Sequence, residues 1–329
     1  MTHIAIFGTG AVGATVGSFL HETGAKVTFI SRGKPLEVMK ANGLTVHYKD
    51  NQKIVHADFV SEHDDFGTPD IILLTVKSYD LPSIAANVAN HTSKDTLIIP
   101  MINGIPWWHF YGLKGSLENF ALSGLDPEGL LAKHIPLSQV LGGVIYVDAT
   151  MEAPGVVRHR ITPKIKIGEP KGKISTRLET LAALFAKAGM ENVASPDIRS
   201  EIWLKLAWNV CFNPISVLTG ATSGPIATDP GTRKLCTLMM QELHALAEKI
   251  GIRFALDVEE RLAIGVKGGT HKPSMLQDFE AGKRMEIEGI IGAIVEISEK
   301  IGYPTPNIAT VHALLHEKAT IHLPQQTRT

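Results

Sequence analysis

Near its amino terminus the chain reads His3-Ile4-Ala5-Ile6-Phe7-Gly8-Thr9-Gly10-Ala11-Val12-Gly13, a short apolar run that passes directly into a glycine-rich turn. The run predicts a buried strand, and Ala11–Glu22 predicts a helix with one apolar stripe. Residues 8–13 fit G-x-G-x-x-G, a pattern typical of dinucleotide-binding domains when it joins a strand to a helix. Gly8 permits the tight turn, Gly10 lets the backbone approach a pyrophosphate, and Gly13 lets the helix lie close to the sheet.

The N-terminus of this helix is therefore the predicted phosphate site, because backbone N–H groups at a helix start bind anions. Its predicted cofactor-binding residues are Gly8, Thr9, Gly10, Ala11, Val12 and Gly13. The alternative is a glycine-rich turn that binds no ligand.

The rest of the first half alternates predicted strands with helix-length segments. The predicted strands are Lys26–Ile30, Leu44–Tyr48, Lys53–Val60, Ile71–Val76 and Thr96–Ile99, and Asp80–Asn90 is a predicted helix. This alternation implies βαβ crossovers and a parallel, doubly wound sheet. Three later strands, Gly142–Val147, Val156–Ile161 and Lys164–Ile167, are expected to extend that sheet in the antiparallel sense.

The second half of the chain has helical periodicity throughout. After Ser175–Ala188 and a short strand at Asn192–Ala194, the predicted helices are Ile198–Phe212, Thr232–Ile250, Val258–Ile264, Leu276–Gly282 and Glu286–Ile301. We place the boundary near Pro196, giving a Rossmann-type α/β domain over residues 1–196 and an all-helical domain over 197–329. Pro214 is expected to end or kink the first of these helices, and the tail 321–329 is expected to fray.

Composition excludes several classes of protein. At about 150 residues per domain, 329 residues make roughly two domains. Lys plus Arg is 32 and Asp plus Glu is 33, a balance that argues against binding to nucleic acid or to a membrane surface. With 2 cysteines and no signal-type segment at Met1, we expect a cytoplasmic protein without a disulfide scaffold.

The identity of the cofactor is indicated by the end of the second strand. A cofactor with a bare ribose usually needs an Asp or Glu about 20 residues after the glycines, but the chain has Ser31 and Arg32 there. Arg32 is suited to a bidentate contact with a ribose phosphate, so we predict NADP(H) rather than NAD(H); the alternative is a solvated arginine. Lys77 and Asn103 each follow a buried strand at the edge where such sheets bind ligands, and either residue could equally belong to an ordinary loop.

A line of polar residues marks the helix over Ile202–Asn213. Nine of these 12 residues are apolar, and the polar ones, Lys205, Asn209 and Asn213, lie four residues apart on one face. A buried ammonium needs partners, so this line suits a small, oxygen-rich anionic substrate. The alternative is that the line is the solvent face of the helix.

Two further residues are candidates for the substrate site. Ser274 begins a predicted helix after Pro273, and Glu286 precedes a strongly apolar helix. Helix capping is the alternative for both. His63-Asp64-Asp65 has no second ligand group at metal spacing, so the sequence predicts no metal site. Trp107-Trp108-His109-Phe110 is expected to be core or the wall of a substrate pocket.

These residues, in this order, resemble the ketopantoate reductase family, whose members are NADPH-dependent enzymes of pantothenate biosynthesis. The resemblance lies in the glycine motif, T-V-K at 75–77, N-G at 103–104, K-L-A-W-N-V-C-F-N-P at 205–214 and S-M-L-Q-D at 274–278, with Glu286 following. It implies a Rossmann domain and a helical domain with the active site between them. It also implies that this chain reduces a small 2-oxo acid, and it leads us to expect a homodimer.

The resemblance assigns roles residue by residue. Lys205 is similar to the catalytic proton donor, and Asn209, Asn213 and Ser274 to substrate-binding residues. The glycine motif with Arg32, Lys77 and Asn103 is similar to the cofactor set, and Glu286 would serve both cofactor and substrate. Two departures concern the substrate pocket: the segment 102–136 is long and aromatic, and Ser223 stands where the family often has a further asparagine.

Two rival functions remain at this point. One is a related two-domain NAD(P)-dependent dehydrogenase acting on a hydroxyacid or a polyol phosphate. The other is a non-catalytic NADP(H) sensor, for which the 205/209/213 line would not matter.

Overall fold

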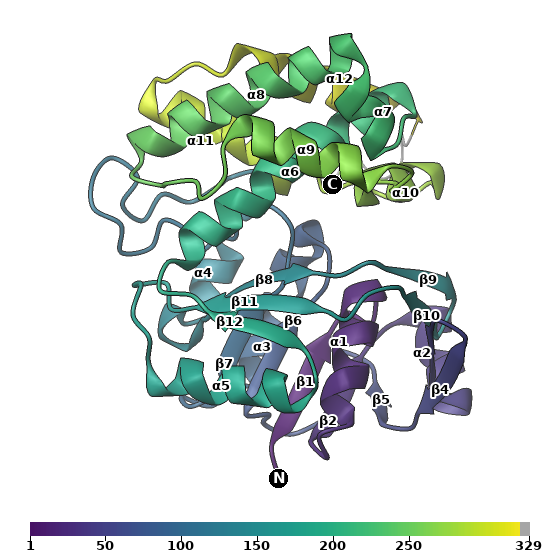
Figure 1. Ribbon diagram of the computed structural model, residues 1–329. Coiled ribbons are helices and arrows are strands. Elements are labelled where there is room, and N and C mark those ends of the chain that lie inside the picture. Colours follow the sequence, from purple (N-terminus) through teal and green to yellow (C-terminus); the bar gives the residue numbers. More distant parts are fainter. Residues whose placement is uncertain (323–329) are drawn as a thin grey trace. The chain divides into compact units, whose positions relative to one another are not determined.

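The computed structural model describes residues 1–322, which form two compact units (Figure 1). Unit 1 comprises Met1–Ile102 and Glu128–Ile198, and unit 2 comprises Asn103–Pro127 and the chain from Arg199 onward. The segment Asn103–Pro127, which the sequence division placed in the first domain, thus groups with the helices. Of the tail predicted to fray, Ile321 and His322 end a helix, and 323–329 lie outside the described residues.

The main sheet of unit 1 is parallel and has the strand order β5-β2-β1-β6-β7. Its strands are β1 (His3–Phe7), β2 (Lys26–Ile30), β5 (Asp58–Val60), β6 (Ile71–Leu74) and β7 (Leu97–Pro100). The crossover helices are α1 (Ala11–His21), α2 (Gly33–Asn42) and α3 (Leu81–Asn90), the last preceded by the 3-10 turn η1 (Ser78–Asp80). The predicted doubly wound α/β fold is therefore confirmed.

The expected antiparallel extension of this sheet is wrong in part, because the later strands form two additional sheets. One has the order β4-β3-β10-β9, over β4 (Asn51–Val55), β3 (Leu44–Tyr48), β10 (Val156–His159) and β9 (Ala149–Ala153), with β10 parallel to β3. The other has the order β12-β11-β8, over β12 (Glu191–Ala194), β11 (Lys164–Gly168) and β8 (Gly142–Tyr146). Helix α1 packs between the main sheet and the β4-β3-β10-β9 sheet, so both of its faces are buried. This close packing on two sides explains why the helix needs glycines and other small residues.

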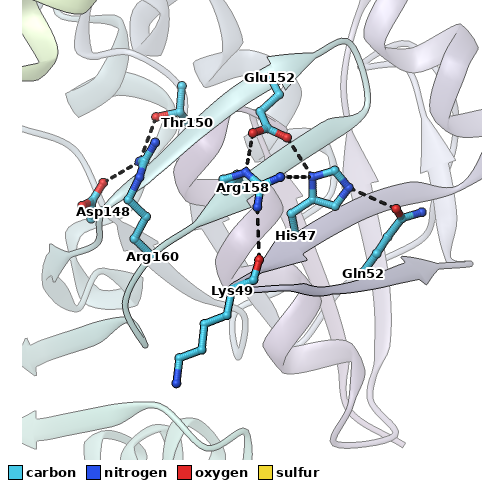
Figure 2. Close-up of polar contacts among 8 residues, drawn as sticks. All are labelled: His47, Lys49, Gln52, Asp148, Thr150, Glu152, Arg158 and Arg160. Atoms are coloured by element: carbon cyan, nitrogen blue, oxygen red, sulfur yellow. Dashed lines mark hydrogen bonds and ion pairs between the residues drawn. The ribbon is translucent and has the colours of Figure 1, made fainter.

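The exposed side of the β4-β3-β10-β9 sheet carries a polar cluster that ties four strands together (Figure 2). Arg158 on β10 is paired with Glu152 on β9, and one of its terminal nitrogens lies 2.9 Å from His47 Nδ1 on β3. The ring of His47 also contacts Gln52 on β4, at 3.3 Å. Such cross-strand pairs stabilise a small sheet whose outer face is exposed to solvent.

The remaining helices of unit 1 are α4 (Leu130–His134) and α5 (Thr176–Lys187), together with the 3-10 turn η2 (Leu137–Gln139).

Unit 2 is helical apart from the segment Asn103–Pro127. Its helices are α6 (Ile198–Thr219), α7 (Ser223–Thr228), α8 (Pro230–Lys249), α9 (Val258–Gly268), α10 (Ser274–Glu280), the π-helix η3 (Glu288–Gly292), α11 (Ala293–Ile301) and α12 (Pro306–His322). Pro214 was predicted to end or kink the helix, and an end is wrong, because α6 continues five residues past it to Thr219. Residues 210–217 are all buried, so packing around the helix offsets the hydrogen bond that proline cannot make. Within residues 1–322, no helix is both long enough and apolar enough to cross a membrane.

The segment Asn103–Pro127 belongs to unit 2 because its aromatic side chains are part of that core. Trp107, Trp108, His109 and Phe110 are all less than 9% exposed. Arg199 at the start of α6 donates to the backbone carbonyls of His109 and Tyr111, each at 2.7 Å. Glu296 on α11 accepts from the N–H groups of Ser123 and Gly124, at 2.7 and 3.2 Å. Of the two interpretations of the aromatic cluster, the structure supports core.

Candidate functional site

The glycine turn after β1 shows which of its three glycines the fold itself requires. Gly8 has φ +99°, and a Cβ atom there would lie 2.7 Å from the backbone nitrogen of Val76. A Cβ atom on Gly13 would overlap the carbonyl oxygen of Gly8. At Gly10, by contrast, a Cβ atom would meet nothing within 4 Å. The protein leaves open space at Gly10, which is where the motif brings a pyrophosphate close to the backbone.

The N-terminus of α1 has the character of an anion site. Gly10 is its N-cap residue, makes no side-chain capping bond, and is followed by no acidic residue in the first turn. The first N–H groups of a helix lack intrahelical partners, and the helix dipole favours a negative group there. Thr9 is turned away, because its hydroxyl donates to the carbonyl of Ile30 at 3.2 Å. Ala11 and Val12, which follow, form the first turn of the helix.

Arg32 and Lys77 lie in the same unit as the glycine turn. Arg32 follows β2, its side chain is 72% exposed, and its guanidinium nitrogen lies 3.4 Å from a carboxylate oxygen of Asp80. Lys77 follows the strand β6 and precedes η1, with its side chain half-buried. Arg32 thus has a guanidinium largely open to a ligand, as a ribose-phosphate contact requires.

In unit 2, three of the predicted residues form one hydrogen-bonded chain. The ammonium nitrogen of Lys205 donates to Oδ1 of Asn103 at 2.9 Å. Nδ2 of Asn103 in turn donates to Oε2 of Glu286 at 3.2 Å. The amide of Asn103 therefore bridges the cation and the carboxylate, although sequence reasoning had grouped it only with the cofactor residues.

The environment of Lys205 makes its ammonium a better acid than usual. Desolvation by burial lowers the pKa of Lys205 from 10.5 to about 8, while the charge of Glu286 acts in the opposite direction. Glu286 itself is 6% exposed, so its carboxylate is enclosed rather than free at a helix start. Its carboxylate accepts from Asn103, and the residue directly precedes the helical residue Ile287.

The rest of the polar line on α6 is buried. Asn209 is 8% exposed and Asn213 is 2% exposed, so the line is not a solvent face. Nδ2 of Asn213 has no hydrogen-bond partner within residues 1–322. A buried amide donor without a partner costs free energy, and a ligand oxygen would satisfy it.

The two serines noted in the sequence differ in their surroundings. Ser274 is the first residue of α10 and is exposed, and Pro273, not Ser274, occupies the N-cap position of that helix. Ser223 is fully buried and its hydroxyl donates to the carbonyl of His271 at 3.1 Å. Ser274 is thus available to a ligand, whereas Ser223 already has a structural partner.

One feature near Asn103 was missed by sequence reasoning, namely the π-helix η3. The carbonyl of Gly289 in η3 accepts from the N–H of Ile105 at 3.0 Å, and a Cβ atom on Gly104 would overlap that carbonyl oxygen. The helix from Glu286 was predicted without this irregularity. The only available signal was the pair of glycines, 289 and 292, inside an apolar helical pattern.

Comparison with protein families and known proteins gives a consistent result. Residues 4–109 match the family model described as ketopantoate reductase PanE/ApbA, and residues 197–319 match the model of the C-terminal domain of the same family. A 2-dehydropantoate 2-reductase of Mesorhizobium japonicum is 37% identical over 317 residues, which are 96% of this chain and 97% of the relative.

Solved structures agree with the observed fold. A candidate ketopantoate reductase from Ralstonia solanacearum superposes with a TM-score of 0.92 at 34% identity, covering 97% of this chain and 98% of that chain. A D-mandelate dehydrogenase, solved with NADH and anilino(oxo)acetate, has a TM-score of 0.84 at 23% identity, covering 98% and 99% of the two chains. The second similarity concerns the fold alone.

Proposed function

The chain belongs to the ketopantoate reductase family, and from this premise we propose that it is an NADPH-dependent reductase of a small 2-oxo acid. The leading substrate is ketopantoate (2-dehydropantoate), whose reduction gives pantoate. The observation that carries the proposal is the hydrogen-bonded chain from Lys205 through Asn103 to Glu286.

The cofactor proposal is supported by the residues of unit 1. The open space at Gly10 and the uncapped start of α1 fit a diphosphate, and the guanidinium of Arg32 fits a ribose 2′-phosphate. Lys77, which follows β6 and directly precedes η1, supplies a further positive charge. When bound, NADPH supplies the hydride that reduces the ketone carbon.

Lys205 is the proposed general acid. As the ketone becomes an alkoxide, the ammonium of Lys205 stabilises the negative charge and then transfers its proton to the oxygen. With a pKa of about 8 this group is protonated at neutral pH, and it is a stronger acid than an ordinary lysine. The bridging amide of Asn103 and the carboxylate of Glu286 hold the ammonium in place.

The substrate is held by the remaining polar groups. The buried amides of Asn209 and Asn213 are donors for substrate oxygens, and the unpartnered Nδ2 of Asn213 supports this role. The hydroxyl of Ser274, an exposed residue at the start of α10, is assigned to the substrate carboxylate. Glu286 is assigned to a hydroxyl of the substrate. Assembly as a homodimer stays a prediction from the family resemblance.

The test is NADPH consumption with a panel of branched 2-oxo acids that includes ketopantoate. Lys205→Ala should lower turnover by at least about a thousandfold while NADPH affinity stays within about twofold of wild type. Lys234→Ala is the matched control, because Lys234 is an exposed lysine on another helix of the same unit. A Lys205→Ala enzyme that keeps most of its rate would refute the assigned role.

This panel, together with oxidation assays that use NADP+ or NAD+, separates the rival functions. Faster oxidation of a different hydroxyacid or of a polyol phosphate would favour the related dehydrogenase. NADPH binding without turnover of any 2-oxo acid would favour the sensor.

A further inference from the structure

The position of Asn103 depends on a close backbone contact between two glycines of unit 2. Gly104, the next residue, has φ +83°, a conformation that side-chain-bearing residues rarely adopt. A Cβ atom at Gly104 would overlap the carbonyl oxygen of Gly289, and Ile105 donates its N–H to that same oxygen at 3.0 Å. The loop that carries Asn103 is therefore pressed against η3 with no room for a side chain.

The partner in this contact is an irregular turn of helix. In η3 the N–H of Ala293 bonds to the carbonyl of Glu288, five residues earlier, which is the π-helical pattern. Glu286 lies two residues before η3, so the same turn that receives Gly104 also carries the carboxylate that Asn103 contacts.

A side chain of η3 contacts another helix. Oε1 of Glu288 lies 3.5 Å from Nε2 of His312 on α12. The carboxylate of Glu288 lies over Gly292, where a Cβ atom would overlap it, and a Cβ atom on Gly124 would lie 3.3 Å from Cβ of Glu288. The titratable and charged groups that act on Glu288 are His312 and His316 of α12 and Arg284 of the preceding loop, and the hydrogen bond from His312 does most to hold the pKa of Glu288 below its usual range.

We propose that η3 is a positioning element for the proton donor. Its contact with Gly104 places the amide of Asn103 between the ammonium of Lys205 and the carboxylate of Glu286. Gly104, Glu288 and His312 are thus positioning residues, which act through Asn103 and Glu286 and touch neither substrate nor cofactor. This inference rests on the proposed function of Lys205.

The proposal makes a specific prediction about Lys205. If Asn103 is displaced, the ammonium loses an acceptor that favours its charged form, so its pKa falls further below about 8. Glu286 is the charged residue that opposes this fall, and a shift of Asn103 also loosens its link to Glu286. A variant that is merely less stable would, while it remains folded, keep both the wild-type pKa of Lys205 and the link between Asn103 and Glu286.

The experiment compares Gly104→Ala with Gly43→Ala. Gly43 lies in unit 1 and has φ +76°, and a Cβ atom there would lie 2.8 Å from the carbonyl oxygen of Val55, against 1.8 Å from the carbonyl oxygen of Gly289 at Gly104. Both substitutions place a side chain at a positive φ, and the conflict with backbone is milder at Gly43. Gly104→Ala should lower kcat by at least about tenfold and move the alkaline limb of the kcat profile toward neutral pH. Gly43→Ala should leave that limb in place.

A second measurement does not need turnover. Lysine 13C NMR titration of the protein without added ligands should show that Lys205 titrates at lower pH in Gly104→Ala than in wild type, with Lys205→Ala used to assign the signal. In a double-mutant cycle, adding Gly104→Ala to Asn103→Ala should lower kcat by no more than about twofold further, since both act at the same point.

If Gly104→Ala does not fold, His312→Gln carries the same test. This change loosens η3 from α12 and leaves Asn103 and Gly104 intact, and we expect a loss in kcat of about threefold to tenfold with the same direction of pH shift. An unchanged Lys205 titration in the folded variant would overturn the positioning proposal. The failure of the proposed function is a different result, namely wild-type protein that turns over no 2-oxo acid or a Lys205→Ala variant that stays active.

Discussion

The indole N–H of Trp203 donates to Nε2 of His109 at 3.0 Å, and both residues are fully buried. Burial, reinforced by the charge of Arg199, lowers the pKa of His109 to about 3, so the ring is neutral at physiological pH. Because Nε2 accepts, the ring proton is on Nδ1. The bond joins the aromatic segment to α6 two residues before Lys205.

Trp203→Phe should therefore destabilise unit 2. The substitution leaves a buried imidazole acceptor without its donor, which costs about 1–3 kcal/mol of unfolding free energy. Urea unfolding measures this loss. Trp208→Phe is the control, because Trp208 stacks on Phe212 at a ring-centroid distance of 3.9 Å and phenylalanine keeps that contact. Equal losses in the two variants would contradict the importance of the hydrogen bond.

The glycine turn predicts opposite behaviour for two alanine substitutions. Gly10→Ala should fold with a melting temperature close to wild type, since its Cβ atom meets no protein atom, yet it should weaken NADPH binding at least about tenfold. Gly13→Ala should reduce stability itself, because its Cβ atom overlaps the Gly8 carbonyl. Thermal melts without cofactor and fluorescence titration with NADPH separate the two effects. Unchanged NADPH affinity in Gly10→Ala would argue against a phosphate at this turn.

Arg32→Ala tests the choice between the two nicotinamide cofactors. Loss of the guanidinium should raise the KM for NADPH by about tenfold to a hundredfold and leave the KM for NADH nearly unchanged, because only NADPH carries the 2′-phosphate. Lys40→Ala is a suitable control, since it removes a positive charge that pairs with Asp64 instead. An equal effect on both cofactors would favour the solvated interpretation of Arg32.

The pH dependence of reduction follows from the protonation of Lys205. Below a pH of about 8 the ammonium holds its proton and kcat should be flat as far as this residue is concerned. Above it, kcat should fall about tenfold per pH unit, because the neutral amine cannot donate. Initial rates with saturating ketopantoate and NADPH, measured between about pH 6 and about pH 10, test this fall in kcat. A rate that rises through this range would be inconsistent with a lysine acid.

Sequence reasoning succeeded where the signal is local. The β1 run, the glycine turn and α1 follow one another within about twenty residues, and each obeys a pattern that neighbouring residues alone determine. The line of Lys205, Asn209 and Asn213 was equally visible, because helical spacing places the three residues on one face whatever packs against it.

It failed where the outcome depends on distant contacts. Nothing near Asn103 indicates that its segment groups with the helices, since the cause is the bond between Trp203 on α6 and His109 and the bond between Glu296 on α11 and the N–H of Ser123. The local rule that proline interrupts a helix does not end α6 at Pro214, because the residues around it are buried and their packing stabilises the helix. Helix α2 was missed for a different reason, because Leu36 and Met39 are its only buried residues and leave little periodic signal.

The division of the chain has a consequence for its synthesis and for truncation. The chain crosses between units after Ile102, returns after Pro127, and crosses again at the start of α6. A fragment ending at the predicted boundary would expose the two tryptophans of residues 107–108, and a fragment starting there would lack Asn103. On the ribosome, this aromatic stretch emerges long before the helices of unit 2. It is therefore exposed, and prone to aggregation, until translation is nearly finished.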